Sequence, residues 1–155
     1  MKKSFLTLVT ALCLLSGCNL TTGVFEHNVA IPGHEWASSF RPEISFTIQD
    51  TTSLYNVYLV LRHSDAFGFN NIWIRATVEQ PGDTAFSSQP LDLTLATNEG
   101  WLGTAMDDIY ENRILIQRLT KFRRPGTYRF TLEQIMRQDP LLHVLNVGIR
   151  IEKSR

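Results

Sequence analysis

Three consecutive residues, His63, Ser64 and Asp65, have the side-chain types of a hydrolytic triad. In such a triad the histidine lies between the nucleophile and the carboxylate, within hydrogen-bond reach of both. Consecutive side chains cannot converge in this way. The chain also has no Gly-x-Ser-x-Gly elbow and no Gly-rich phosphate loop. The sequence therefore predicts no catalytic residue and a protein that is not an enzyme.

The densest acidic group is Asp107, Asp108 and Glu111. A general acid–base pair or a calcium site would need these carboxylates to converge on one point. Acids in this order are more typical of the start of a helix, where they complement the helix dipole. We expect a solvated helix start here and no site.

Metal ligation has little support in the sequence. The histidines are dispersed and follow no metal-binding spacing: His27, His34, His63 and His143. Such residues are usually exposed or hydrogen-bonded structural groups. We expect no metal site and no cofactor.

Cys18 is the residue with the clearest chemistry. It ends the segment Leu15-Ser16-Gly17-Cys18, which looks like a bacterial lipobox, and it follows Lys2, Lys3 and an apolar run of eleven residues. A helix needs roughly 20 residues to cross a bilayer, so this run indicates a cleaved signal peptide, residues 1–17. We predict lipidation of Cys18 by acyl chains such as palmitate. Ordinary cleavage that leaves Cys18 as a free thiol is the alternative.

The segment after the anchor bears on the cellular location. Asn19 stands at the second position where an aspartate retention signal would lie, which favours an outer membrane protein facing the periplasm.

Removal of residues 1–17 takes away Cys13, Lys2 and Lys3 and leaves 13 basic and 15 acidic side chains, a net charge of −2. Nucleic-acid binding therefore has no electrostatic support, and Cys18 is left without a disulfide partner.

The tryptophans are the candidate interaction surface. Trp73 lies on the predicted outer face of a strand, and Trp36 and Trp101 lie near loops. Exposed tryptophans stack on sugars or anchor protein partners. Tryptophan in a sandwich is more often part of the core, so this prediction competes with a purely structural role.

Alternation of apolar and polar side chains dominates the chain and predicts an all-β fold. About eight strands are expected, over residues 24–31, 44–48, 55–61, 72–78, 91–95, 114–119, 128–132 and 147–151. Gly/Pro turns between them favour an antiparallel two-sheet β-sandwich, jelly-roll-like, with one or two short helices at residues 106–112 and 132–138. Residues 18–23 are expected to be a lipidated tether and residues 24–155 a single domain.

The order of these segments resembles the gliding-motility lipoprotein family GldH of the Bacteroidota. The likeness is carried, in order, by Tyr55-Asn56-Val57-Tyr58, Leu61-Arg62-His63, Asn71-Ile72-Trp73, Trp101-Leu102-Gly103, Asp108-Ile109, Gly126-Thr127-Tyr128-Arg129-Phe130, Glu133-Gln134-Ile135-Met136-Arg137 and Val147-Gly148-Ile149-Arg150-Ile151-Glu152. The resemblance implies a non-enzymatic envelope lipoprotein of the gliding machinery. It carries over no catalytic or ligand-binding residue, and only Cys18 maps to a function.

Two functions remain open from the sequence. The first is a lipid-tethered interaction protein that binds envelope, motility or secretion proteins through an edge strand or an aromatic patch. The second is a carbohydrate-binding module at the cell envelope, since sandwiches of this kind often bind glycans through exposed tryptophans.

Overall fold

The computed structural model describes residues 23–83 and 86–154. The predicted signal peptide, Cys18 and nearly all of the predicted tether lie outside these residues. The described part contains strands and one short 3-10 helix. They are β1 (Val24–Ala30), η2 (Pro32–His34), β2 (Glu35–Trp36), β3 (Glu43–Ile48), β4 (Tyr55–Ser64), β5 (Asn71–Glu79), β6 (Phe86–Thr94), β7 (Ala96–Thr97), β8 (Gly100–Trp101), β9 (Thr104–Met106), β10 (Ile109–Thr120), β11 (Gly126–Gln134), β12 (Leu141–Leu142) and β13 (Val144–Lys153). The all-β prediction is confirmed.

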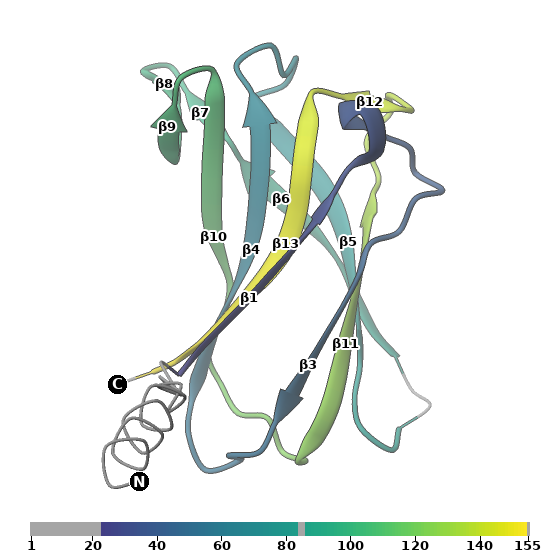
Figure 1. Ribbon diagram of the computed structural model, residues 1–155, viewed down its shortest axis with the longest axis vertical. Coiled ribbons are helices and arrows are strands. Elements are labelled where there is room, and N and C mark those ends of the chain that lie inside the picture. The colour runs from purple at the N-terminus through teal and green to yellow at the C-terminus, as the bar shows by residue number, and fades with distance from the viewer. Residues whose placement is uncertain (1–22, 84–85, 155) are drawn as a thin grey trace, which may run out of the picture.

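The long strands form two sheets that face one another (Figure 1). The larger has five strands in the order β1-β13-β4-β10-β9, and the smaller has four in the order β3-β11-β5-β6. All of these neighbours pair antiparallel. Two further two-stranded ribbons, β12-β2 and β7-β8, lie beside them, so the described chain has four sheets. The jelly-roll connectivity stays a prediction.

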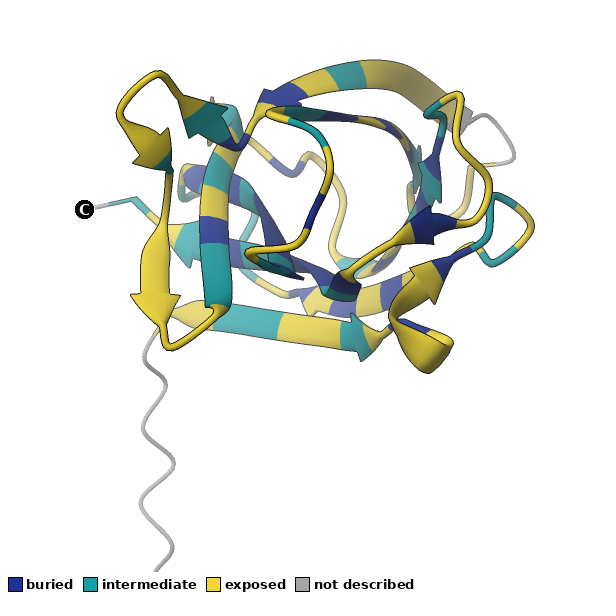
Figure 2. Ribbon diagram, turned by 90° about the horizontal axis from the view of Figure 1, so that it is seen from above, coloured by how far each residue is buried: buried dark blue, intermediate teal, exposed yellow. Residues whose placement is uncertain are grey.

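Buried and exposed positions alternate along the strands (Figure 2). In β3 the pattern is strict, with Ile44, Phe46 and Ile48 buried and their neighbours exposed. The phenyl ring of Phe46 lies 5.7 Å from that of Phe25 and 5.8 Å from that of Phe130, so aromatic side chains from both sheets meet in the core. Burial of this apolar surface is the main force that holds the sheets together.

The eight predicted strands are all present, but both predicted α-helices are wrong. Instead of a helix at residues 106–112, β9 and β10 form a hairpin in which Met106 pairs with Ile109. Asp107 takes a positive φ of 53° in the turn, a conformation that short polar residues tolerate. Asp107 and Asp108 therefore mark a hairpin turn and not a helix start.

The second predicted helix, at residues 132–138, begins inside β11. Leu132 and Gln134 are both buried, so the alternation of the strand continues through a polar residue. The backbone NH of Ile135 then donates to the carbonyl oxygen of Trp73 over 3.0 Å, which extends the pairing with β5. Burial of Gln134 was invisible in the sequence, and its neighbours therefore resembled a helical pattern.

Candidate functional site

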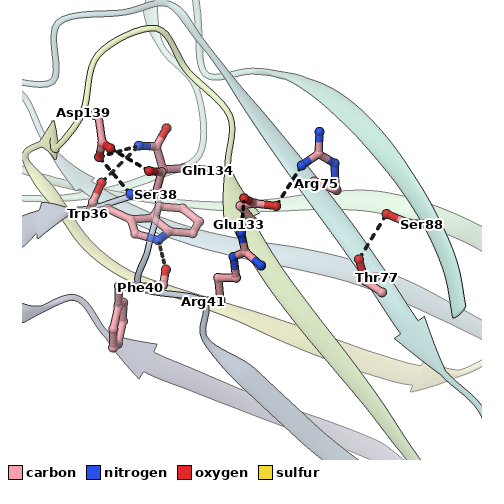
Figure 3. Close-up of polar contacts among 10 residues, drawn as sticks. All are labelled: Trp36, Ser38, Phe40, Arg41, Arg75, Thr77, Ser88, Glu133, Gln134 and Asp139. Carbon is pink, nitrogen blue, oxygen red and sulfur yellow. Dashed lines mark hydrogen bonds and ion pairs between the residues drawn. The ribbon is translucent and has the colours of Figure 1, made fainter.

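Trp36 belongs to the core and not to an interaction surface. Its side chain is completely buried, and its indole NH donates to the carbonyl oxygen of Phe40 over 2.9 Å (Figure 3). Its strand β2 pairs with β12, where Trp36 lies opposite Leu141. The prediction that Trp36 contributes to an exposed surface is wrong, because this ribbon folds the side chain inward.

A small polar network holds Trp36 in place (Figure 3). Asp139 accepts hydrogen bonds from the backbone NH and the hydroxyl of Ser38, at 2.8 and 2.6 Å. The buried amide of Gln134 donates to the carbonyl oxygen of Trp36 over 3.3 Å. The hydrogen bonds from Ser38 also lower the pKa of Asp139, so the carboxylate stays ionised. These polar residues are structural.

Trp101 is half-buried at the end of the sandwich where β8 lies. Its indole ring lies 4.7 Å from the imidazole of His63 and 5.9 Å from the ring of Tyr110. The ring of Phe67 completes the group at 5.2 Å from His63. Trp101 therefore mainly covers His63 and presents only part of its surface to solvent.

His63 is a buried structural histidine. Its Nδ1 lies 2.9 Å from the carbonyl oxygen of Ser64, and its Nε2 lies 3.2 Å from the side-chain nitrogen of Asn112. These partners fit a neutral ring that donates from Nδ1 and accepts at Nε2. Burial lowers the pKa of His63, against a smaller opposing effect of the hydrogen bond to Ser64. In the described chain the ring is paired with no carboxylate, so it is not oriented as a triad base.

The acidic residues also fail to converge. Asp107 and Asp108 lie in the β9–β10 turn, whereas Glu111 lies on the outer face of the larger sheet. There Glu111 pairs with Arg113 at 2.8 Å and with Arg62 at 3.6 Å. Within residues 23–83 and 86–154, no group of three or more potential ligand residues is placed to hold a metal ion.

Trp73 lies on the outer face of β5, as the alternation of Ile72 and Ile74 predicts. Its side chain is 40% exposed. Beside it is a hollow of about 360 Å³, lined by Phe69, Trp73, Ile135, Met136 and Arg137. Four of these five side chains are apolar. A cluster of large apolar side chains on the surface of a folded protein is typical of a protein contact site. We call this set of five residues the Trp73 hollow.

The surface next to the Trp73 hollow is polar. Arg75, two residues along β5, donates to Glu133 over 2.8 Å, and Arg41 reaches the other oxygen of the same carboxylate at 2.9 Å (Figure 3). Farther along, Thr77 donates to Ser88 over 3.1 Å. Exposed ion pairs of this kind contribute little to stability, about 1 kcal/mol or less each. They give the hollow a polar rim, as protein interfaces have around an apolar centre.

The edge strands offer a second means of contact. β9 pairs only with residues 109–111 of β10, so the described strands leave the rest of that edge unpaired. The register shifts after Leu115 and again after Gln117, which marks two irregularities in the same stretch. Such bulges discourage edge-to-edge pairing. The Trp73 hollow is therefore a stronger candidate than this edge.

Reasoning from the sequence missed four residues of the hollow: Phe69, Ile135, Met136 and Arg137. Phe69 lies in the β4–β5 loop, and Ile135, Met136 and Arg137 follow the end of β11. Ile135, Met136 and Arg137 belong to one of the segments that resemble the family, whereas Phe69 belongs to none. Nothing in the sequence places these segments side by side, because that depends on the pairing of β5 with β11.

Comparison with known proteins supplies the remaining evidence. The family model described as GldH lipoprotein matches residues 23–151. The protein called gliding motility lipoprotein GldH homolog, from Christiangramia forsetii, is 25% identical over 94% of this chain and 93% of its own length. The gliding motility lipoprotein GldH of Flavobacterium johnsoniae is 27% identical over 99% of this chain and 98% of its own length.

A solved structure shows a more distant likeness. The subviral particle protein VP2 of infectious bursal disease virus aligns with 83% of this chain and 32% of its own, at 10% identity and a TM-score of 0.36. At that score the likeness supports no inference about this protein.

Proposed function

Because this chain belongs to the GldH lipoprotein family, we propose that it is a lipid-anchored protein of the bacterial cell envelope that binds another envelope protein and catalyses no reaction. The names of its relatives favour a partner in the gliding-motility machinery. In a non-motile host the same binding surface serves envelope or secretion proteins.

The proposed anchor is Cys18, acylated after removal of residues 1–17. The lipobox-like segment and the family both support this assignment. Each acyl CH₂ group buried in lipid contributes about 0.8 kcal/mol, so two or three chains on one residue hold the protein permanently. Over the described residues, no helix has the length and apolar character to cross a membrane. Asn19 favours the outer membrane with the domain facing the periplasm.

The proposed binding site is the Trp73 hollow. The observation that carries this proposal is the exposure of Trp73 beside four other residues of one hollow, three of them apolar. Tryptophan and arginine are among the residues most enriched at the energetic centres of interfaces, and the hollow has one of each in Trp73 and Arg137. The ion-paired sheet face beside it fits the polar rim of an interface.

The test is chemical crosslinking in intact cells, followed by purification of the acylated protein and mass spectrometry. The wild-type protein is expected to enrich one or more envelope proteins. A Cys18→Ala variant should lose membrane attachment, and a Trp73→Ala variant should keep attachment but lose the partner. Enrichment of polysaccharide or peptidoglycan fragments without a protein would overturn the proposal in favour of the carbohydrate-binding function.

A further inference from the structure

Where the chain enters the sandwich, β10 and β13 end and β4 begins (Figure 1). The backbone NH of Lys153, at the end of β13, donates to the carbonyl oxygen of Gly23 over 2.9 Å. Lys153 pairs with Tyr55 at the start of β4, and Tyr55 pairs on its other side with Thr120 at the end of β10. Because neighbouring strands are about 4.8 Å apart, these three steps across the sheet place Thr120 about 14 Å from Gly23, the entry point. We call this the anchor end.

The loop that follows Thr120 is fixed to the core at this end. Phe122 is buried, with its ring 5.3 Å from that of Tyr55 and 4.8 Å from that of Tyr128. The hydroxyl of Tyr128 donates to the carbonyl oxygen of Arg124 over 2.9 Å. With Phe122 held inside, the residues on either side of it are exposed.

These exposed side chains are basic. The stretch of residues 113–124 contains five lysines and arginines and no acid. Arg118, Lys121 and Arg123 form no ion pair with any residue that the structure describes. Arg124 has one acidic neighbour, Asp83, at 3.7 Å. The anchor end therefore presents at least three uncompensated positive charges, although the mature chain is expected to be acidic overall.

The opposite end of the sandwich has the opposite charge. Asp65, Glu99, Asp107 and Asp108 lie in its loops and turns, and among the described residues none of them forms an ion pair. Charge is thus separated along the strand direction. A negatively charged surface next to the anchor would orient such a molecule with its basic end inward.

Large apolar side chains accompany the basic ones. Val24, Leu54 and Leu119 are 40%, 42% and 47% exposed at the anchor end. Leu119 has a positive φ of 49°, and its backbone NH donates to the side-chain oxygen of Asn56 over 3.0 Å. The irregular strand end therefore turns Leu119 outward. Basic and apolar side chains together are typical of surfaces that rest on lipid headgroups.

We propose that the basic anchor end, formed by Arg118, Lys121, Arg123 and Arg124 with Leu54 and Leu119, lies against the anionic surface of a lipid bilayer. This inference rests on the proposed acylation of Cys18, which brings the bilayer close. Four residues lie between Cys18 and Gly23, and the five steps from one Cα atom to the next span at most about 18 Å when the chain is fully extended. The contact holds the sandwich upright on its anchor, so that the opposite end lies away from the membrane, with the Trp73 hollow on the sheet face near that end.

The test uses the full mature, acylated protein reconstituted in vesicles. A single fluorescent label is attached at Gln49→Cys, in the exposed loop after β3 at the anchor end, or at Asn98→Cys in the β7–β8 turn at the opposite end. Vesicles of phosphatidylethanolamine with phosphatidylglycerol are compared with vesicles of phosphatidylcholine alone, both with a headgroup quencher. The Gln49 label should be quenched strongly only in the anionic vesicles, and the Asn98 label in neither.

Charge variants make the test specific. Each basic residue near an anionic surface shifts the population in contact by about fivefold, so Arg118→Gln, Lys121→Gln and Arg123→Gln together should abolish the quenching. A control with Arg41→Gln, Arg75→Gln and Arg137→Gln removes the same charge elsewhere and should retain it. In 1 M salt the Debye length is about 3 Å, and quenching should disappear.

Several results would overturn the proposal. They are equal quenching at Gln49 in neutral vesicles, retained quenching in the triple variant, and a Gln49 label that responds only to a soluble anionic polysaccharide. If the proposed acylation of Cys18 is wrong, the experiment gives a different result. A protein that is not acylated would stay out of both kinds of vesicle, and its Cys18 thiol would take up the label.

Discussion

The backbone NH of Trp73 donates a hydrogen bond to the sulfur of Met136 over 3.2 Å. This contact joins β5 to the segment that follows β11, and the carbonyl oxygen of Trp73 accepts from the NH of Ile135 on the same side. Both contacts use the backbone of Trp73, so its indole is not needed to hold the two segments together. The side chain is therefore available for binding.

Trp73→Ala should abolish capture of the partner with little loss of folding. Because the indole is 40% exposed, we expect the free energy of unfolding to fall by about 1–2 kcal/mol. Denaturant unfolding and crosslinking of the same variant check both expectations. If Trp73→Ala captures the partner as well as the wild type does, the hollow is not the binding site.

Trp36→Ala, in contrast to Trp73→Ala, should mainly lower the stability of the fold. Its indole is completely buried and hydrogen-bonded to Phe40, so truncation leaves a large cavity and an unpaired carbonyl oxygen. We expect a loss of about 3–5 kcal/mol in the free energy of unfolding, measured by denaturant titration. A loss below about 1 kcal/mol would show that Trp36 is not part of the core.

His63 should make stability depend on pH. Burial lowers the pKa of His63 in the folded chain below the value of about 6.5 for the unfolded chain, so the unfolded state binds more protons between the two values. Its contribution is complete above about pH 6.5 and is lost as the pH falls from there toward the folded pKa. The slope of unfolding free energy against pH in this window should be smaller in His63→Gln than in the wild type. Identical slopes in the two proteins would show that His63 is not the source of this pH dependence.

Gly103 should tolerate no side chain. It has a φ of +92°, and a Cβ there would lie 2.3 Å from the carbonyl oxygen of Glu111 and 2.9 Å from the side-chain oxygen of Asn112. Strain and overlap together predict that Gly103→Ala lowers the unfolding free energy by about 2–4 kcal/mol. Gly68→Ala is the matched control. A Cβ at Gly68 has nothing within 4 Å, so its thermal midpoint should stay close to that of the wild type.

The sequence predicted the long strands because alternation is readable wherever one face is buried. It missed the short strands β2, β7, β8, β9 and β12, each of two or three residues, because so short a stretch shows no period. The two predicted helices failed for local reasons. Asp107 adopts a turn conformation, and buried Gln134 continues a strand whose polar residue resembled an outward position.

The candidate site was predicted only in part. Trp73 was identifiable as outward-facing because it stands between buried Ile72 and Ile74. The burial of Trp36 depends on the pairing of β2 with β12, two segments far apart in the chain. The basic stretch from Arg113 to Arg124 is visible in the sequence. Its position beside Gly23 follows only from the order of β13, β4 and β10 in the sheet.

The most direct test of the central claim, that the Trp73 hollow holds an envelope protein, is site-specific photo-crosslinking in living cells. A photoreactive amino acid replaces Gln138, exposed beside the hollow, or Ser45, exposed on β3 of the same sheet. We predict a discrete protein adduct from position 138 that disappears when Trp73→Ala is added, and none from position 45. An adduct of equal yield from position 45, or no adduct from position 138 in correctly anchored protein, would contradict the account.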